Sequence, residues 1–165
     1  MEIERSLLSD VGNLLLNAEE TVSVAESVTS GFLQFSFSQM ADASRYYRGG
    51  ITAYTIDEKV KFLGIDRVQA EKCDCVSEQI AEVMALNIAK SFETDFGIAV
   101  TGYATPVAES DFKIFAYFSF SYKNEIVFNK KLELHPRTNQ QNAQIYYCEF
   151  ILGCFKTKLS ELQSD

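Results

Sequence analysis

The alternation of apolar and polar positions divides the chain into helical and extended segments. Residues 3–19 place an apolar side chain every three or four positions, which is the period of a helix with one buried face. Residues 21–25 (T-V-S-V-A) alternate with a period of two instead, and this indicates a short strand. The same patterns predict helices over 29–40, 57–63, from Ser77 through Ile88, and from Pro136 to Leu162, and strands over 51–54, 96–101, 113–122 and 125–134.

Turn and cap residues lie between these segments. Ser77 has the side chain of a helix N-cap, and Gly64 follows a helix where a left-handed residue is favoured. Lys123-Asn124 separates two β-rich runs and predicts a hairpin. We expect Arg48-Gly49-Gly50 to break the chain before the second strand, and Pro136 to begin the last helix.

The order of the segments predicts the fold class. Helices and strands alternate along most of the chain, and the hairpin adds antiparallel strands. No linker, repeat or low-complexity stretch interrupts the pattern. We therefore expect residues 1–165 to form a single α/β domain, a three-layer α/β/α sandwich with a mixed sheet.

Composition and charge narrow the possible functions. A chain of 165 residues with 47% hydrophobic and 23% charged residues can bury one core. Its formal charge of −8 argues against binding to nucleic acid or to an anionic membrane. We expect a cytoplasmic protein, because the chain has neither a signal-peptide pattern nor an apolar run that would span a bilayer. With one histidine and no second cysteine pair at zinc-finger spacing, we expect no metal site and reduced thiols at Cys73, Cys75, Cys148 and Cys154.

Candidate chemical groups follow three of the predicted strands. Glu26-Ser27 ends the first, Tyr54-Thr55 the second and Thr101-Gly102 the third. Lys59 follows Tyr54 by five positions, in the first turn of the next helix. Ligands bind at the carboxyl ends of strands in open α/β sheets, so these side chains are expected to share one site.

Several stretches carry the motifs of a known family. The family pattern A-E-S-C-T-G-G matches A-E-S-V-T-S-G at 25–31, and F-R-G-G-V-V-A-Y-S-N-E-A-K matches Y-R-G-G-I-T-A-Y-T-I-D-E-K at 47–59 without gaps. The pattern A-V-S-E matches C-V-S-E at 75–78, and A-V-T-G-I-A-G-P matches A-V-T-G-Y-A-T-P at 99–106. Over nearly its whole length the chain resembles the CinA-type C-terminal domain (competence/damage-inducible protein), whose enzymatic members are nicotinamide mononucleotide deamidases.

This resemblance implies a metal-independent amidohydrolase without a cofactor. Ser27, at a helix N-terminus, would be the nucleophile, with the backbone N–H groups of Thr29 to Gly31 stabilising negative charge. Lys59 would be the base and Tyr54 a proton relay. The ligand would be a small nucleotide, and the protein a stand-alone homo-oligomer, a dimer or higher. The substrate-binding residues implied are Glu26, Thr29, Ser30, Gly31, Arg48, Thr101, Gly102 and Arg137.

The chain departs from the family where the ligand would be held. Residues 105–112 contain no glycine, although the family loop is glycine-rich, and Glu109 and Asp111 add negative charge. Gln141 stands where the family has an arginine, and Ser30 replaces a glycine. The alternative is therefore a catalytically inactive or substrate-altered relative that binds a ligand or regulates.

Each candidate residue also has a structural explanation. Ser27 and Thr29 are typical helix caps. Taken singly, Tyr54 is typical of a strand aromatic whose hydroxyl reaches the edge of the sheet, and Lys59 is typical of a solvated helix residue. Arg48 and Arg137 are ordinary surface charges. The aromatic run 112–122 indicates a packed hairpin or a subunit interface. The joint presence of Ser27, Tyr54 and Lys59 in family order favours catalysis for these three only.

Overall fold

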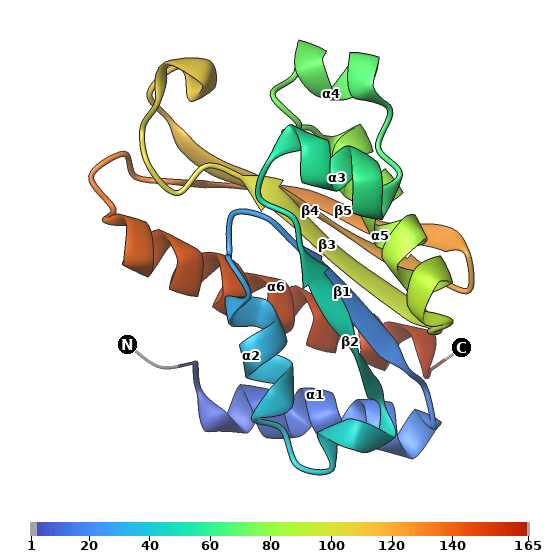
Figure 1. The fold of residues 1–165 in the computed structure, drawn as a ribbon. Helices are drawn as coiled ribbons and strands as arrows, with labels where there is room; N and C mark the ends of the chain where they lie inside the picture. Colours follow the sequence, from blue (N-terminus) through green and yellow to red (C-terminus); the bar gives the residue numbers. More distant parts are fainter. Residues whose placement is uncertain (1–2, 165) are drawn as a thin grey trace.

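A mixed five-stranded sheet lies between two layers of helices in the computed structural model of the protein, which describes residues 3–164 (Figure 1). The strand order is β2-β1-β3-β4-β5; β1 runs parallel to β2 and β3, and β4 runs antiparallel to β3 and β5. The strands are β1 (Val22–Glu26), β2 (Tyr47–Thr52), β3 (Phe96–Gly102), β4 (Ile114–Tyr122) and β5 (Glu125–Leu134).

The helices divide between the two faces of this sheet. One core cluster joins α1, α2 and α6 to the sheet, and a second joins α3, α4 and α5 to the opposite face. The predicted three-layer α/β/α arrangement is therefore confirmed. No helix within residues 3–164 has the length and apolar character needed to cross a membrane. The helices are α1 (Arg5–Ala18), α2 (Phe32–Ser38), α3 (Ile56–Leu63), α4 (Arg67–Lys72), α5 (Glu78–Phe92) and α6 (Gln140–Leu162), with 3₁₀ turns at Ala43–Arg45 and Ala108–Ser110.

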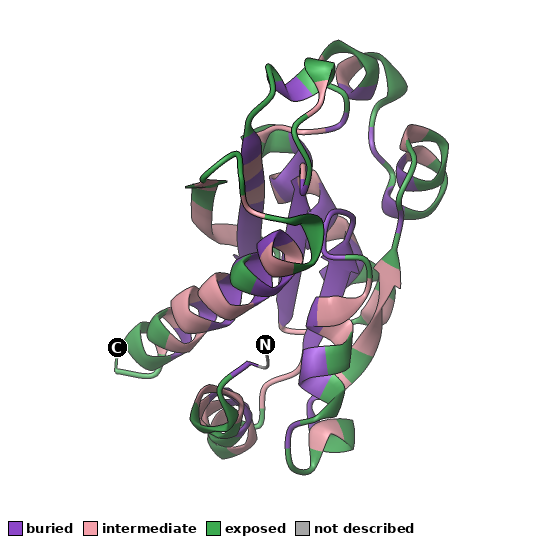
Figure 2. Cartoon of the chain, turned by 90° about the vertical axis from the view of Figure 1, so that its left-hand side faces the viewer, coloured by how far each residue is buried: buried purple, intermediate pink, exposed green. Residues whose placement is uncertain are grey.

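Phe155 of α6 lies at the centre of the larger core. Its ring meets those of Phe37, Phe96 and Phe120 edge-on, with centroids 6.3, 5.3 and 5.3 Å away. Phe118 and Phe120 of β4 are at most 1% exposed beneath α6, so the aromatic run forms a packed hairpin. The central strands β1 and β3 are buried along nearly their whole length, whereas the edge strands β2 and β5 and the outer helix surfaces are partly or fully exposed (Figure 2).

The second strand begins earlier than the sequence predicts. β2 starts at Tyr47, so Gly49 and Gly50 lie inside the strand and do not break the chain before it. A side chain at position 50 would meet the Val24 carbonyl oxygen and the Gln34 side chain, and Gly49 has a φ of +121°. The glycines therefore allow β2 to lie close to β1 and α2.

The other predicted helix ends agree with the structure where the expected residue caps the helix, and differ where another residue does. Ser77 accepts a hydrogen bond from the Ile80 N–H, and Gly64 ends α3 in the left-handed region, both as predicted. The prediction that α6 begins at Pro136 is wrong, because the Asn139 side chain caps the helix and α6 begins at Gln140. Helix α2 begins at Phe32, three residues later than expected, and α4 was not predicted.

Candidate functional site

The parallel strands β1 and β3 end at the same edge of the sheet, and a cavity of about 290 Å³ opens there. Figure 1 shows α3 and the loop after β3 beyond this edge. Ser27, Tyr54 and Lys59 all line the cavity together with Gly102, so the segments that follow β1, β2 and β3 meet as expected. The complete lining is Ser27, Val28, Tyr54, Thr55, Ile56, Lys59, Asp74, Val76, Gly102, Tyr103, Ala104, Thr105, Val107 and Gln140.

Ser27 lies in a bend directly after β1, not at a helix N-terminus. The Ser30 N–H donates to the Ser27 carbonyl oxygen over 3.1 Å, which closes a turn, and α2 begins only at Phe32. Ser27 is 5% exposed, and among residues 3–164 its hydroxyl has no hydrogen-bond partner. The side chain is thus buried at the cavity wall without the structural bond that a helix cap makes.

Glu26, the last residue of β1, occupies the N-terminus of α2. Its fully buried carboxylate accepts the Thr29 hydroxyl at 2.5 Å and the N–H groups of Gly31, Leu33 and Gln34 at 3.2, 3.0 and 2.6 Å. A protein carboxylate thus fills the anion position that a helix start provides. The Gly31 N–H that the sequence suggested for an oxyanion is therefore already engaged.

The backbone N–H groups nearest Ser27 are those of the turn itself. Ser30 and Gly31 donate to protein oxygens, as described above. The N–H groups of Val28 and Thr29 have no protein acceptor within residues 3–164, and Val28 lines the cavity. Val28 is therefore the better-placed donor for negative charge that develops beside Ser27.

Lys59 of α3 is a buried lysine beside the cavity. It is 4% exposed, and no ion pair or hydrogen bond involves its Nζ within the described chain. Burial lowers its pKa below the ordinary lysine value, and Cys75, Asp74 and Cys73 partly oppose this shift. Tyr54 is 64% exposed at the same cavity, so its hydroxyl is accessible to a ligand.

Asp74 and Tyr103 also line the cavity, and sequence reasoning missed both. The Tyr103 hydroxyl donates to Oδ2 of Asp74 over 2.9 Å. Asp74 and Cys75 are consecutive residues with positive φ, +50° and +58°, and the Thr101 hydroxyl holds the Cys75 carbonyl at 2.8 Å. The replacement of the family's isoleucine by Tyr103 in G-Y-A-T-P was the sequence signal that marked this position.

The glycine-free loop folds onto itself. The N–H groups of Ser110, Asp111, Phe112 and Lys113 donate to carbonyl oxygens of the loop, and the Val107 N–H donates to Ser110 Oγ. Asp111 and Phe112 have φ values of +54° and +57°, which are uncommon for residues with a side chain. The loop therefore presents few free N–H groups to a ligand.

Several residues proposed for substrate binding lie outside the cavity lining. Arg48 is exposed on β2 near the start of β1, at the opposite end from Ser27, and Arg137 is exposed in the loop before α6. Of the predicted binding residues, Gly102 lines the cavity. Glu26, Thr29, Ser30, Gly31 and Thr101 are not among the lining residues, and their binding roles stay predictions.

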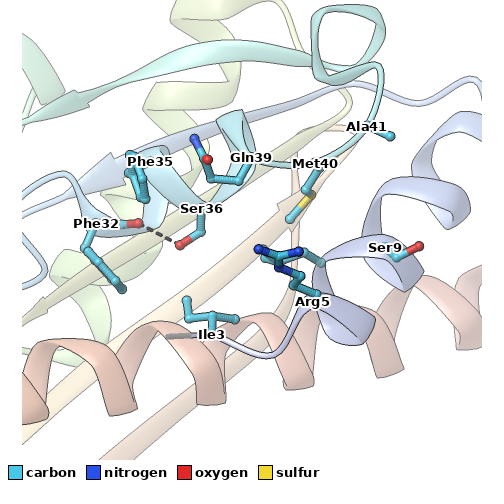
Figure 3. Close-up of a pocket in the computed structure, with 10 residues that line it drawn as sticks. Ile3, Arg5, Ser9, Phe32, Phe35, Ser36, Gln39, Met40 and Ala41 are labelled. Carbon is cyan, nitrogen blue, oxygen red and sulfur yellow. Dashed lines mark hydrogen bonds between the residues drawn. The ribbon is translucent and has the colours of Figure 1, made fainter. Parts of the chain in front are cut away.

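A second cavity of about 550 Å³ lies between α1 and α2, away from the strand ends (Figure 3). Phe32, Phe35 and Met40 form its apolar wall, and Arg5 is its charged group. A hydrogen bond from Ser36 to the Phe32 carbonyl, 2.8 Å long, stays within α2. Among residues 3–164, no three His, Cys, Asp or Glu side chains group in a way that would hold a metal ion.

Comparisons with known proteins agree on one family. A sequence profile of the CinA C-terminal domain matches residues 4–148. A CinA-like protein of Rippkaea orientalis is 41% identical over 110 residues, 67% of this chain and 26% of that protein. A CinA-like protein of Synechocystis sp. is 45% identical over 103 residues, which are 62% of this chain and 25% of that protein. The chain thus spans about a quarter of the length of these relatives.

Solved structures with the same fold are more distant in sequence. A competence-damaged protein (CinA) superfamily protein from Klebsiella pneumoniae has a TM-score of 0.87 at 21% identity, covering 94% of this chain and 97% of that one. A competence or damage-inducible protein from Enterobacter asburiae has a TM-score of 0.85 at 22% identity, covering 93% and 96%. These likenesses concern the fold.

Proposed function

The chain belongs to the CinA C-terminal domain family, and we propose that it hydrolyses the carboxamide of a nicotinamide ligand with Ser27 as the nucleophile. Nicotinamide mononucleotide is the substrate that the family resemblance suggests. The products would be the corresponding carboxylate and ammonia.

The observation that carries this proposal is the setting of Lys59. A buried lysine with a lowered pKa, which forms no ion pair with any residue of 3–164, lines the same cavity as a buried serine. Burying an ammonium without a partner is costly, and such lysines occur where a neutral amine has a chemical task. A lysine needed only for solubility would be exposed at the surface.

The reaction follows from these groups in two halves. Neutral Lys59 takes the proton of Ser27, whose oxygen attacks the amide carbon; the C–N bond then breaks, and the proton passes to the leaving nitrogen, which departs as ammonia. Water then attacks the resulting ester and gives one proton to Lys59. The ester C–O bond breaks, Lys59 returns that proton to the Ser27 oxygen, and the acid loses its remaining proton to water and leaves as the carboxylate. Tyr54, exposed at the cavity, would pass the proton to the leaving group.

The turn after Ser27 would stabilise the intermediate. The Val28 N–H has no protein acceptor in the described part of the chain, and Val28 directly follows Ser27. The Glu26 carboxylate accepts four hydrogen bonds from the turn and the start of α2. The turn, and with it the Val28 N–H, is therefore held in place before a substrate arrives. A single donor of this kind contributes roughly 10²–10³ in rate in other hydrolases.

The second candidate is a relative that binds an altered ligand without turnover. The closed loop at 105–112 favours it, because a family loop rich in glycine would offer more free N–H groups. Both candidates predict a ligand in the same cavity. They differ in whether the amide bond breaks.

Ammonia release from nicotinamide mononucleotide and from other nicotinamide carboxamides tests the proposal. We expect turnover by the wild type and a loss of about 10⁴-fold in Ser27→Ala and in Lys59→Met. Ser38→Ala, a change on an exposed face of α2, is the matched control and should keep full activity. Turnover that survives in Ser27→Ala would exclude the serine mechanism, and silence from a folded wild type would favour the binding relative.

A further inference from the structure

β5 lies at one edge of the sheet and carries a long hydrogen-bonding edge without a neighbouring strand (Figure 1). The strand has 10 residues, Glu125–Leu134, and within residues 3–164 it pairs with β4 alone. The other edge strand, β2, has 6 residues, two of which are glycines. The edge of β5 therefore presents the longer row of backbone groups to which a further strand can bind.

The pairing of β4 with β3 decides which residues of β5 face outward. The Tyr103 N–H donates to the Phe115 carbonyl oxygen over 2.8 Å, so Phe115 and every second residue along β4 direct their backbone groups to β3. The residues between them direct theirs to β5. By the register of the hairpin, three residues of β5 therefore direct their N–H and C=O groups to the free edge: Asn129, Lys131 and Glu133.

The charges along this edge are complementary to a second copy of the same strand in one register. A strand that pairs antiparallel with its own copy about a two-fold axis opposes one residue to itself. An axis at Lys130, Lys131 or Glu133 would oppose like charges, which is destabilising. An axis at Leu132 opposes Lys131 to Glu133 on both sides of a leucine pair. An axis nearer the hairpin turn would include the bulge at Val127, where the alternation of backbone groups is interrupted.

An apolar groove of about 740 Å³ lies beside the same edge, between β5 and α6. Leu132 and Leu134 line it from the strand, and Tyr146 and Phe150 line it from the helix, all of them at least partly exposed. Gly153 continues this face of α6 at helical spacing, and a Cβ added there would meet no atom within 4 Å. The groove thus joins the edge strand to an apolar helix face that is open to close approach.

We propose that two copies of this chain associate through β5, paired antiparallel about a two-fold axis at Leu132, so that their sheets become continuous. Lys131 and Glu133, 3.4 Å apart within one chain, then also pair across the axis, and the two apolar grooves cover each other. The occupant is a second copy because the charge pattern is complementary to this strand itself. The inference is independent of the proposed function, since none of these residues lines the cavity beside Ser27.

Sedimentation equilibrium of the purified full chain measures this association. We expect a reversible dimer that is weakened about tenfold in Lys131→Glu and in Glu133→Lys, because each change opposes like charges at two symmetric places. The variant with both changes only exchanges the opposed charges and should return to within about threefold of the wild-type constant. Glu125→Lys makes the same change in net charge as Glu133→Lys outside the paired residues, and should leave the constant unchanged. A monomer at every concentration, or a dimer that does not respond to these charges, would overturn the proposal.

Disulfide cross-linking tests the register. The Leu132 pair would be a non-hydrogen-bonded one, with Cα atoms about 4.5 Å apart, which a disulfide can bridge. Leu132→Cys should therefore form a covalent dimer when oxidised glutathione is added. Lys130→Cys, which would lie opposite Leu134 of the second copy, should cross-link no more than the wild type, whose 4 cysteines set the background. Cross-linking of Lys130→Cys in preference to Leu132→Cys, or of neither above that background, would contradict the proposed interface.

Discussion

The carboxylate of Glu26, at the end of β1, accepts the backbone N–H of Gln34 in α2 at 2.6 Å. The same side chain accepts the Thr29 hydroxyl and the N–H groups of Gly31 and Leu33, so one buried residue ties the strand to the helix. The turn that carries Ser27 lies between these attachment points. Its geometry therefore depends on a residue that does not line the cavity.

Glu26→Gln should destabilise the protein. Both carboxylate oxygens accept hydrogen bonds from N–H groups. The NH₂ group of a glutamine cannot accept a hydrogen bond, so one set of these N–H groups would lose its acceptor, which lowers the free energy of unfolding by about 1–3 kcal/mol. Urea unfolding measures the change in the free energy of unfolding. Glu58→Gln, at an exposed acid of α3, is the control and should stay within about 0.5 kcal/mol. If the two variants were equally stable, Glu26 would not hold this turn.

The sequence predicted those features that periodicity and cap chemistry decide. The hairpin at Lys123-Asn124 forms as expected, with both residues at positive φ. The meeting of Ser27, Tyr54 and Lys59 in one cavity follows from the rule that parallel strands end together. The order of helices and strands was enough to place these three.

Features that depend on contacts between distant segments were not predictable. Gly50 lies within β2 because Val24 and Gln34 approach it, and no local pattern reveals that approach. No local pattern indicates that the Glu26 side chain, rather than the residues around Ser27, accepts the first N–H groups of α2. The hydrogen bond from Tyr103 to Asp74 joins positions 29 residues apart, so no local pattern reveals that these two residues form a pair.

The pH dependence of ammonia release should report on Lys59. Catalysis by this lysine requires its neutral form, and burial lowers its pKa. The rate should therefore rise with pH through that pKa and level off below the pH at which an ordinary lysine titrates. Lys59→Arg should lose about 10³-fold or more, because a guanidinium stays protonated. A rate that shows no rise with pH anywhere below the ordinary lysine pKa would exclude Lys59 as the base.

The same lysine should make folding stability depend on pH. With its pKa lowered in the folded state, the unfolded chain binds more protons between the folded and unfolded pKa values, so stability rises with pH across that window. Lys59→Met removes this contribution. We expect the variant to be more stable than the wild type at neutral pH, and the difference to shrink as pH rises toward the ordinary lysine pKa. Denaturant unfolding at several pH values checks this, and a constant difference would contradict it.

Phe155→Ala should be among the most destabilising changes in the chain. The ring is fully buried against Phe37, Phe96 and Phe120, and its removal leaves a cavity between α6 and the sheet. Such truncations cost about 3–5 kcal/mol. Phe35→Ala, at a ring that is 56% exposed, removes the same group from the surface and should cost far less. Thermal unfolding of both variants measures the difference in their loss of stability. Equal losses in the two variants would mean that α6 packs loosely against the sheet.

Ser110→Ala should loosen the loop at 105–112, which contributes Thr105 and Val107 to the cavity lining. Ser110 is 2% exposed, and its Oγ lies 2.7 Å from the Lys113 carbonyl oxygen and 3.0 Å from that of Val107, whose N–H it also accepts at 3.3 Å. Without the hydroxyl the Val107 N–H and the Lys113 carbonyl oxygen lose this partner, at a cost of about 1–3 kcal/mol, while the Val107 carbonyl oxygen keeps the N–H groups of Ser110 and Phe112.

Because this loop is short and stands at the edge of the fold, the loss should appear as local opening before global unfolding. In the Ser110→Ala variant, the backbone amides of residues 110–113 should exchange hydrogen faster than in the wild type. The amides of α5 should keep their wild-type exchange rates. Ser38→Ala, which removes an exposed hydroxyl from α2, is the control and should leave the loop unchanged. Unaltered exchange at 110–113 would mean that the loop does not depend on Ser110, and the closed conformation would then need another cause.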